Sequence, residues 1–99
     1  EQQLLDKNIV VTSTVLKVGH HGSRTSSSVD FLQAVNPRWA VISCGFDNSF
    51  GHPHQEIVDR IQAYTEADIL RTDRQGAICF TTNGEKINYS VYNNSNYFR

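Results

Sequence analysis

Two apolar, β-branched stretches separated by one short helical pattern constrain the fold of this chain more than any other feature. Residues Ser13 to Val18 and Trp39 to Cys44 are each apolar enough to form a buried strand. Between them, Ser27 to Asp30 has the Ser-x-x-acid form of a helix N-terminus, and Asn36-Pro37 ends the helix. A strand, a crossover helix and a second strand form a right-handed parallel unit. We therefore expect two parallel neighbouring strands with a helix at residues 28 to 35 packed against them.

The rest of the chain continues this alternation and ends in a hairpin. Asn83-Gly84 is a strong hairpin signal, and Pro53 suits the first turn of a helix, which places His52 at or near the helix cap. The remaining predicted elements are a helix tail at Glu1 to Lys7, a helix at residues 53 to 65, strands at Ile69 to Arg71 and Ala77 to Thr82 joined by a turn that contains Asp73 and Gly76, and a strand at Lys86 to Tyr92. We expect an α/β domain over residues 1–92, with a mixed sheet and helices on one face, and a polar tail at residues 93–99 that frays.

Composition limits the classes of protein that fit this pattern. With 99 residues, of which 38% are hydrophobic, the chain is one small domain or part of one. A net charge of −1 excludes a broadly basic protein that coats nucleic acid, although a local patch is compatible with phosphate contacts. No run reaches the roughly 18 apolar residues of a membrane span. We expect Cys44 and Cys79 to be reduced core cysteines, with a disulfide or a metal role as the alternatives.

Each of the two parallel strands runs into a loop that carries histidine. The first loop contains His20-His21-Gly22-Ser23, and the second contains Asn48-Ser49-Phe50-Gly51-His52-Pro53. In α/β sheets, ligands bind at the loops that leave the carboxyl ends of the strands. Because the parent strands are consecutive and parallel, we expect the loops at Gly19 to Ser27 and Gly45 to His52 to converge on one rim.

The paired histidines suit metal chemistry but make only part of a metal site. Successive side chains of a strand point to opposite faces, so we expect one of His20 and His21 to be a strand-end ligand and the other to support it or contact substrate. Neutral imidazole binds zinc or manganese, but a stable site needs about four ligands. Capping and loop hydrogen bonds are the alternative role for this pair, and a helix cap is the alternative for His52. His54 is expected to be an exposed helix residue.

Other residues also have a structural and a functional interpretation. The hydroxyl run Thr25 to Ser28 fits a flexible polar loop and helix cap better than a phosphate cradle. Arg71, Thr72 and Asp73 fit local hydrogen bonds that close a turn better than contact with the rim of the site. Trp39, at the start of a strand, is expected in the core.

Three blocks of the sequence together resemble one protein family. They are Leu-Lys-Val-Gly-His-His-Gly-Ser-Arg-Thr-Ser at residues 16 to 26, Val-Ile-Ser-Cys-Gly-Phe-Asp-Asn-Ser-Phe-Gly-His-Pro at residues 41 to 53, and Arg-Thr-Asp-Arg-Gln-Gly-Ala-Ile at residues 71 to 78. In this order they resemble the carboxyl-terminal part of the metallo-β-lactamase-like domain of ComEC-type competence proteins, over roughly residues 4 to 87. Related phosphorylcholine esterases share the His-His-Gly part.

The resemblance implies half of a metallo-β-lactamase-like αββα sandwich with a two-metal, phosphodiesterase-like site that uses zinc or manganese. His21 is the implied metal ligand, with His20 as the alternative. The implied catalytic residues are His52 and Asn48, and the implied substrate-binding residues are Ser23, Arg24 and Asn48. Ser23, Asn48 and His52 would hold phosphate oxygens, and Arg24 would add a charge-assisted contact.

The family's remaining metal ligands lie upstream of these blocks. Its members carry a histidine-rich motif and a bridging aspartate before the His-His-Gly-Ser block, and neither is present in this chain. We therefore expect the fragment alone to bind no metal and to be inactive, whereas the intact domain is expected to be a hydrolase that acts on DNA. The implied partners are DNA and the membrane channel portion of the same protein. The implied location is a soluble, extracytoplasmic domain of a bacterial inner-membrane protein. The alternative is a non-catalytic domain that binds DNA or docks to the channel.

Overall fold

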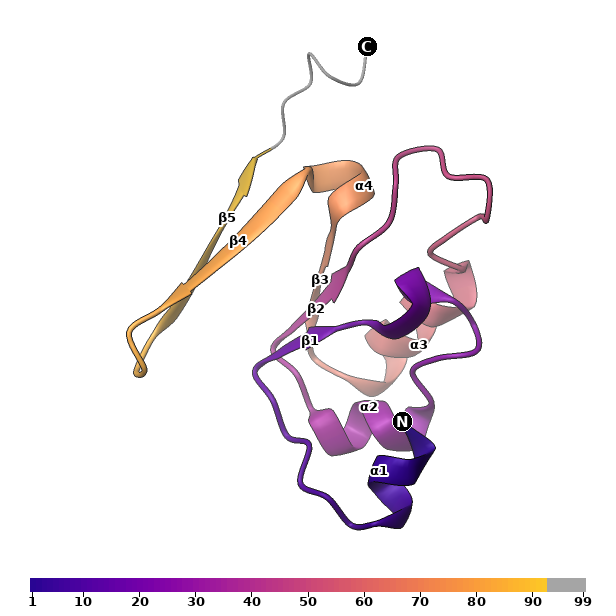
Figure 1. Cartoon of the computed structure of the whole chain (residues 1–99), viewed down its shortest axis with the longest axis vertical. Helices are drawn as coiled ribbons and strands as arrows, with labels where there is room; N and C mark the ends of the chain where they lie inside the picture. The colour runs from indigo at the N-terminus through magenta and orange to yellow at the C-terminus, as the bar shows by residue number, and fades with distance from the viewer. Residues whose placement is uncertain (93–99) are drawn as a thin grey trace.

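The computed structural model of the chain describes residues 1–92 and contains a parallel sheet, a separate hairpin and short helices (Figure 1). Its elements in chain order are α1 (Gln2–Asp6), β1 (Val15–Lys17), the turn η1 (Gly19–Gly22), α2 (Val29–Val35), β2 (Trp39–Ile42), α3 (Gln55–Tyr64), β3 (Asp68–Arg71), α4 (Thr72–Gln75), β4 (Ala77–Thr82) and β5 (Ile87–Tyr92). The polar tail predicted at residues 93–99 lies outside the described residues. Within residues 1–92, no helix has the length and apolar character needed to span a membrane.

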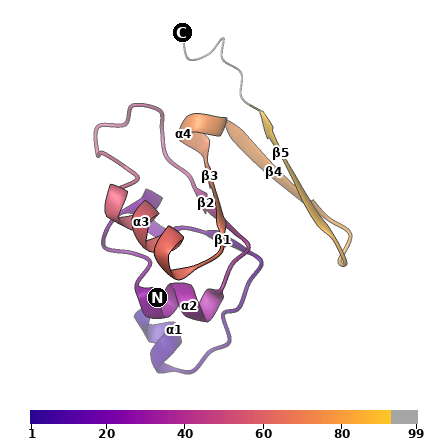
Figure 2. The same ribbon diagram turned by 180° about the vertical axis from the view of Figure 1, so that it is seen from behind.

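β1, β2 and β3 form a parallel sheet in that order, which confirms the predicted parallel pairing of the first two strands. The pairing of Val15 with Trp39 sets the register between β1 and β2. The crossover helices α2 and α3 lie on the same side of this sheet in both opposite views (Figures 1 and 2). β1 begins later than predicted because the N–H of Ser13 donates to the carbonyl oxygen of Val35, at the end of α2, and not to a strand.

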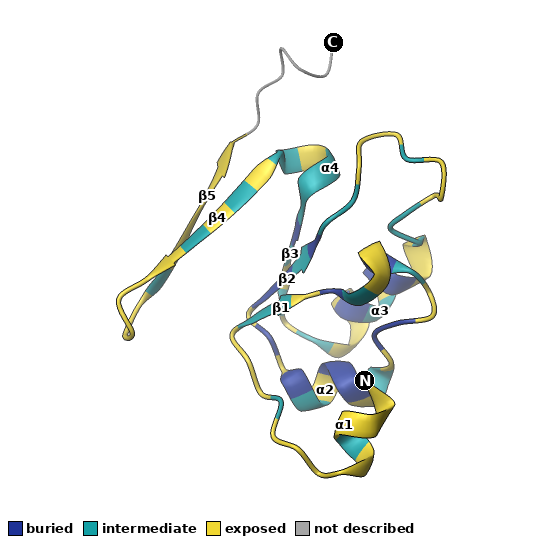
Figure 3. Ribbon diagram, viewed as in Figure 1, coloured by how far each residue is buried: buried dark blue, intermediate teal, exposed yellow. Residues whose placement is uncertain are grey.

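The core lies between the parallel sheet and its two helices (Figure 3). Ala40 and Ile42 project from β2 into this layer, where both are fully buried. Leu32 of α2 and the pair Ile57 and Ile61 of α3 meet them and are also fully buried. Burial of one such aliphatic side chain stabilises the fold by about 1.5–3 kcal/mol. The helical spacing of Ile57 and Ile61 therefore determines which face of α3 meets the sheet, as predicted.

The hairpin forms a second sheet, so the predicted single mixed sheet is not what forms. β4 and β5 pair antiparallel on either side of Asn83-Gly84, as predicted. Trp39 is buried, as predicted, and points from β2 away from the helices; its ring centroid lies 5.7 Å from that of Phe80 and 5.8 Å from that of Tyr89. These contacts hold the hairpin against the sheet face opposite α2 and α3 (Figure 2). The helical turn α4 stands where a simple turn was predicted and separates β3 from β4.

The start of α3 differs from the prediction in a way that affects the site. α3 begins at Gln55 with His54 at the cap position, so Pro53 precedes the first turn and His52 lies two residues before the cap. The physical reason is that the N–H of His54 donates to the carbonyl oxygen of Gly22 at 3.0 Å. This hydrogen bond ties the start of α3 to the first histidine loop.

Candidate functional site

The paired histidines lie in a left-handed turn beyond β1 and not on the strand itself. β1 ends at Lys17, and His20, His21 and Gly22 have φ angles of 50°, 56° and 82°. Positive φ angles are unfavourable for residues other than glycine, so the backbone is strained at His20 and His21. The alternation expected for a strand end therefore does not apply to this pair, and the turn itself sets the direction of each imidazole.

Buried hydroxyl groups hold this turn in place. Ser26 and Ser27 are 5% and 0% exposed. The Ser26 hydroxyl lies 3.0 Å from the carbonyl oxygen of Gly19 and 2.9 Å from that of Ser23, at the two ends of the turn. The hydroxyls of Ser26 and Ser28 therefore bond to the protein's own backbone, and the expected flexible loop is packed at Ser26 and Ser27.

The charged side chains of Glu1 and Arg60 form hydrogen bonds with the backbone of the same loop. The carboxylate oxygens of Glu1 accept the N–H of Ser27 at 2.8 and 2.7 Å. A guanidinium nitrogen of Arg60, on α3, donates to the carbonyl oxygens of Ser26 and Ser27 at 3.2 and 3.0 Å. Charge-assisted bonds of this kind are roughly twice as strong as neutral ones. The loop that presents the histidines is thus anchored to both α3 and the start of the chain.

His21 is oriented as a metal-binding imidazole would be. Its Nδ1 lies 2.6 Å from the backbone carbonyl oxygen of Ser43, just after β2. A carbonyl oxygen only accepts, so Nδ1 carries the proton and Nε2 of the neutral ring keeps its lone pair. A metal-ligating histidine characteristically donates its second ring N–H to a carbonyl or carboxylate. The donor chemistry of His21 therefore fits a metal ion.

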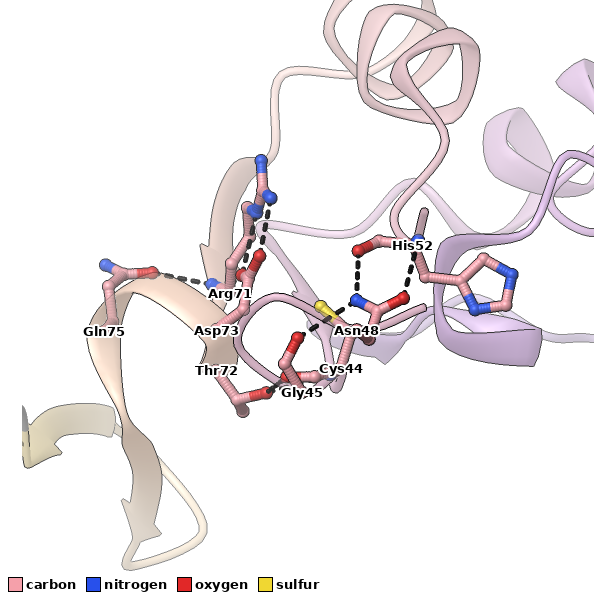
Figure 4. Close-up of polar contacts among 8 residues, drawn as sticks. All are labelled: Cys44, Gly45, Asn48, His52, Arg71, Thr72, Asp73 and Gln75. Atoms are coloured by element: carbon pink, nitrogen blue, oxygen red, sulfur yellow. Dashed lines mark hydrogen bonds and ion pairs between the residues drawn. The ribbon is translucent and has the colours of Figure 1, made fainter. Parts of the chain in front are cut away.

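The side chain of Asn48 folds the second loop around itself (Figure 4). Its Nδ2 donates to the carbonyl oxygens of Gly45 and His52 at 3.0 and 2.7 Å. Its Oδ1 accepts the N–H groups of Phe50 and His52 at 3.2 and 3.0 Å. The His52 ring points out of the loop, away from this amide (Figure 4). Asn48 thus uses its donor and acceptor atoms to set the position of His52.

The two loops meet at one cavity, as the parallel pairing of their strands predicts. The cavity has a volume of about 210 Å³, and its lining residues are His21, Cys44, Gly45, Asn48, Phe50 and His52. The His21 and His52 rings are stacked with centroids 6.1 Å apart. His20 does not line this cavity; it lines a second one of about 420 Å³, together with Arg24, Thr25 and Arg60. The structure therefore separates the two histidines and brings only His21 to His52.

His54 joins the two loops, and the expectation of a merely exposed helix residue is wrong. Its Nδ1 accepts the N–H of Arg24 at 2.9 Å, and its ring centroid lies 5.0 Å from that of His52. The Arg24 side chain forms an exposed ion pair with Glu56 at 3.0 Å. Ser23 lies nearby, with its hydroxyl 3.0 Å from that of Thr25. The cap position of His54 could be found from sequence only once the true start of α3 is known.

The surroundings of His52 favour the neutral form of its imidazole. Partial desolvation, with added repulsion from the rings of His54 and His21, lowers the pKa of His52 below its ordinary value. That ordinary value is about 6.5. At neutral pH the cavity therefore contains an uncharged imidazole, which can donate or accept a proton at its rim.

Residues of α4 reach the same cavity through Cys44 (Figure 4). The N–H of Cys44 donates to the Thr72 hydroxyl, and that hydroxyl donates to the Cys44 carbonyl oxygen, both at 2.9 Å. Asp73 and Arg71 form an ion pair with side chains only 12% and 15% exposed. The local hydrogen bonds predicted for this segment are confirmed, and Thr72 adds a contact to the rim that sequence reasoning did not favour.

The charges around Cys44 shape its chemistry. Burial and the Asp73 carboxylate raise the pKa of the Cys44 thiol, so it is protonated at neutral pH. Burial alone would raise the pKa of Asp73, but the hydrogen bonds and charge of Arg71 outweigh burial and lower it. Both Cys44 and Cys79 are free, and Cys79 is exposed on β4, so the prediction that both cysteines lie in the core is wrong for Cys79.

The described part of the chain, residues 1–92, contains no group of three or more His, Cys, Asp or Glu side chains placed to hold a metal ion. His21 fits one ligand position, and a stable site needs about four ligands. The assignments of metal, catalytic and substrate roles to His20, His21, Asn48 and His52 therefore stay predictions, on a geometry that is now defined.

The fold and the cavity define an α/β chain with histidines at the carboxyl ends of its parallel strands. Comparison with known proteins finds similarity to one group of bacterial proteins. The chain is 37% identical over 92 residues to ComE operon protein 3 of Bacillus subtilis, covering 93% of this chain and 12% of that protein. It is 48% identical over 68 residues to Competence protein ComA of Neisseria gonorrhoeae, covering 69% of this chain and 10% of that protein. Recombination protein 2 of Haemophilus influenzae is 45% identical over 53 residues, covering 54% of this chain and 7% of that protein.

The chain is therefore a homologue of one segment of the ComEC-type competence proteins, which confirms the resemblance. It spans about an eighth or less of the length of these relatives. No family model matches the chain. No solved structure matches it either.

Proposed function

We propose that this chain forms the carboxyl-terminal half of a metallo-β-lactamase-like αββα sandwich in a longer competence protein. The intact domain is, in this proposal, a metal-dependent phosphodiesterase that acts on DNA during its uptake. The observation that supports the proposal most is the convergence of His21 and His52 on one cavity at the carboxyl ends of β1 and β2. The names of the relatives, which include Competence protein ComA of Neisseria gonorrhoeae, support the biological setting.

In this proposal His21 is a metal ligand through Nε2. The Ser43 carbonyl oxygen holds Nδ1–H and so keeps Nε2 available. A zinc or manganese ion bound with the ligands of the upstream half would polarise the phosphodiester and activate water. His20 lines the other cavity, which makes it the weaker candidate.

His52 acts on the substrate in this proposal, and Asn48 acts through His52. A neutral imidazole can donate a hydrogen bond to a phosphate oxygen, or receive a proton and pass it to the leaving oxygen. Asn48 keeps the loop that carries His52 in one conformation, which is a positioning role. Ser23 and the exposed Arg24 stand further along the rim, where Arg24 can exchange Glu56 for a phosphate group.

The partners of the longer protein follow from the same proposal. DNA is the substrate, and a membrane channel portion of the same protein receives one strand, with the domain on the extracytoplasmic side of the bacterial inner membrane. The alternative is a domain that binds DNA or docks to the channel without cutting.

The proposal is tested by steady-state cleavage of DNA by the full-length protein with manganese or zinc supplied. We expect His52→Ala and Asn48→Ala to keep their bound metal and to lower kcat by about ten- to a thousand-fold, because positioning and charge stabilisation act in the transition state. Tyr64→Ala, an exposed aromatic change on α3 away from the cavity, is the matched control. Cleavage by His52→Ala at the unmodified rate would leave His52 with a structural role only.

A further inference from the structure

Three aromatic rings form a stepped row from the cavity to the protein surface. The His52 ring is stacked on His21 with an interplanar angle of 23°, and the Phe50 ring is stacked on His52 with an interplanar angle of 19° and centroids 5.8 Å apart. All three residues line the same cavity. Phe50 is 75% exposed at the outer end of the row. The row therefore presents a flat apolar ring to solvent at the mouth of the candidate site.

The backbone under this ring is held in place. The N–H of Phe50 donates to Asn48 Oδ1, the same oxygen that accepts the N–H of His52. One amide side chain thus fixes the spacing between the exposed ring and the imidazole beneath it. An aromatic ring that is held in position loses little conformational entropy when a ligand stacks on it.

We propose that Phe50 stacks an unpaired nucleobase at the mouth of the cavity and so makes the site selective for single-stranded nucleic acid. This inference rests on the proposed function, because it presumes a nucleic-acid substrate. Every base has a π-face that can stack on an aromatic side chain, so such a contact tolerates any sequence. Bases inside a duplex are already stacked on their neighbours and are not available to this ring.

The position of Phe50 suits nucleotide binding, because the histidines of the candidate site line the same cavity. A base stacked on the outer face of Phe50 carries its phosphodiester along the rim lined by His52 and His21. The His52 ring is stacked beside Phe50, so its polar atoms can meet a phosphate oxygen while the base is held outside. Phe50 is thus a specificity residue that holds the nucleotide next to the reacting bond.

The test measures binding of the full-length protein to three fluorescent probes, with metal chelated so that binding is separated from cleavage. The probes are single-stranded oligothymidylate, the same backbone with abasic sites, and a duplex of equal length. We expect Phe50→Leu, which keeps an apolar side chain without a ring, to weaken oligothymidylate binding by about tenfold or more. Abasic and duplex binding should change little, and Phe50→Trp should retain the preference for thymine. Tyr64→Ala is the matched control.

Three outcomes would overturn the inference. Equal losses of thymine and abasic binding in Phe50→Leu would mean that the ring packs against the rest of the protein and not against a base. Unchanged binding of all probes would remove Phe50 from the site, and so would a failure of the unmodified protein to bind any of them. An unmodified protein that prefers bases through Phe50 but never cuts DNA would contradict only the proposed hydrolase.

Discussion

At Gly22 the two histidine loops approach so closely that a methyl group has no room. A Cβ added there would lie 2.6 Å from Cβ of Pro53 and 3.3 Å from a methyl carbon of Ile42, on a backbone with φ of +82°. We expect Gly22→Ala to lower the free energy of unfolding by about 2–4 kcal/mol, because conformational strain and overpacking add. Gly51→Ala is the matched control, since Gly51 has φ of +69° and no atom within 4 Å. Chemical denaturation of both variants measures the difference, and equal losses would contradict the tight contact.

The lowered pKa of His52 predicts a pH dependence with a definite sign. Below the ordinary histidine pKa of about 6.5, His52 is protonated in the unfolded chain but still largely neutral in the folded chain. The free energy of unfolding therefore decreases as the pH falls from about 6.5 through the lowered pKa. We expect His52→Gln to remove part of this acid destabilisation, with His20→Gln on the other cavity as the comparison. Thermal melts between neutral and acidic pH measure it. Identical pH profiles for the unmodified protein and His52→Gln would contradict the desolvated environment.

Sequence alone could place histidines at this rim, because their strands and loops follow from hydrophobic pattern. It could not separate His20 from His21, because both lie in a left-handed turn where strand alternation has no meaning. The roles of His54 and Glu1 were also out of reach, since each depends on a contact between loops that are distant in sequence.

At the scale of elements, the ion pair between Arg71 and Asp73 locks β3 to α4. Because the pKa of Asp73 is lowered in the folded protein, the ion pair contributes to the free energy of unfolding above the ordinary carboxyl pKa. This contribution is lost as the pH falls through the lowered pKa. We expect Asp73→Asn to destabilise the protein by about 2 kcal/mol at pH 7, with the difference shrinking in acid. Asp68→Asn, an exposed change on β3, should have little effect. Urea titrations across pH measure it, and a loss that persists undiminished in acid would rule out the ion pair as the cause.

The elements themselves were largely predictable from local signals. Ser28 caps α2 by accepting the N–H of Phe31 at 3.2 Å, one residue after Ser27, which the Ser-x-x-acid pattern predicts as the cap. Asn83-Gly84 correctly predicted the hairpin. The separation of this hairpin from the parallel sheet was not predictable, because it depends on the long-range packing of Trp39 against Phe80 and Tyr89.

At the scale of the whole molecule, the two faces of the parallel sheet differ. One face is covered by α2 and α3 and contains the fully buried core (Figure 3). Within residues 1–92, the other face contacts the hairpin through Trp39, and the hairpin residues Val91 and Tyr92 are 40% and 64% exposed. A large exposed apolar surface marks an interaction site more often than chance. This asymmetry is compatible with the proposed half-sandwich, in which the upstream half of the domain supplies the remaining metal ligands.

The most direct test of the proposed metal site is the metal content of the full-length protein, measured by mass spectrometry together with the rate of DNA cleavage. Both are measured for the unmodified protein, for His21→Ala and for His20→Ala. We expect His21→Ala to lose bound metal and cleavage together, because Nε2 of His21 is a metal ligand in the proposed site, and we expect His20→Ala to retain its metal. Loss of metal in His20→Ala but not in His21→Ala would contradict the assignment made from the Ser43 hydrogen bond. An unmodified protein that binds DNA but never cuts it with zinc or manganese supplied would replace the hydrolase with the binding domain.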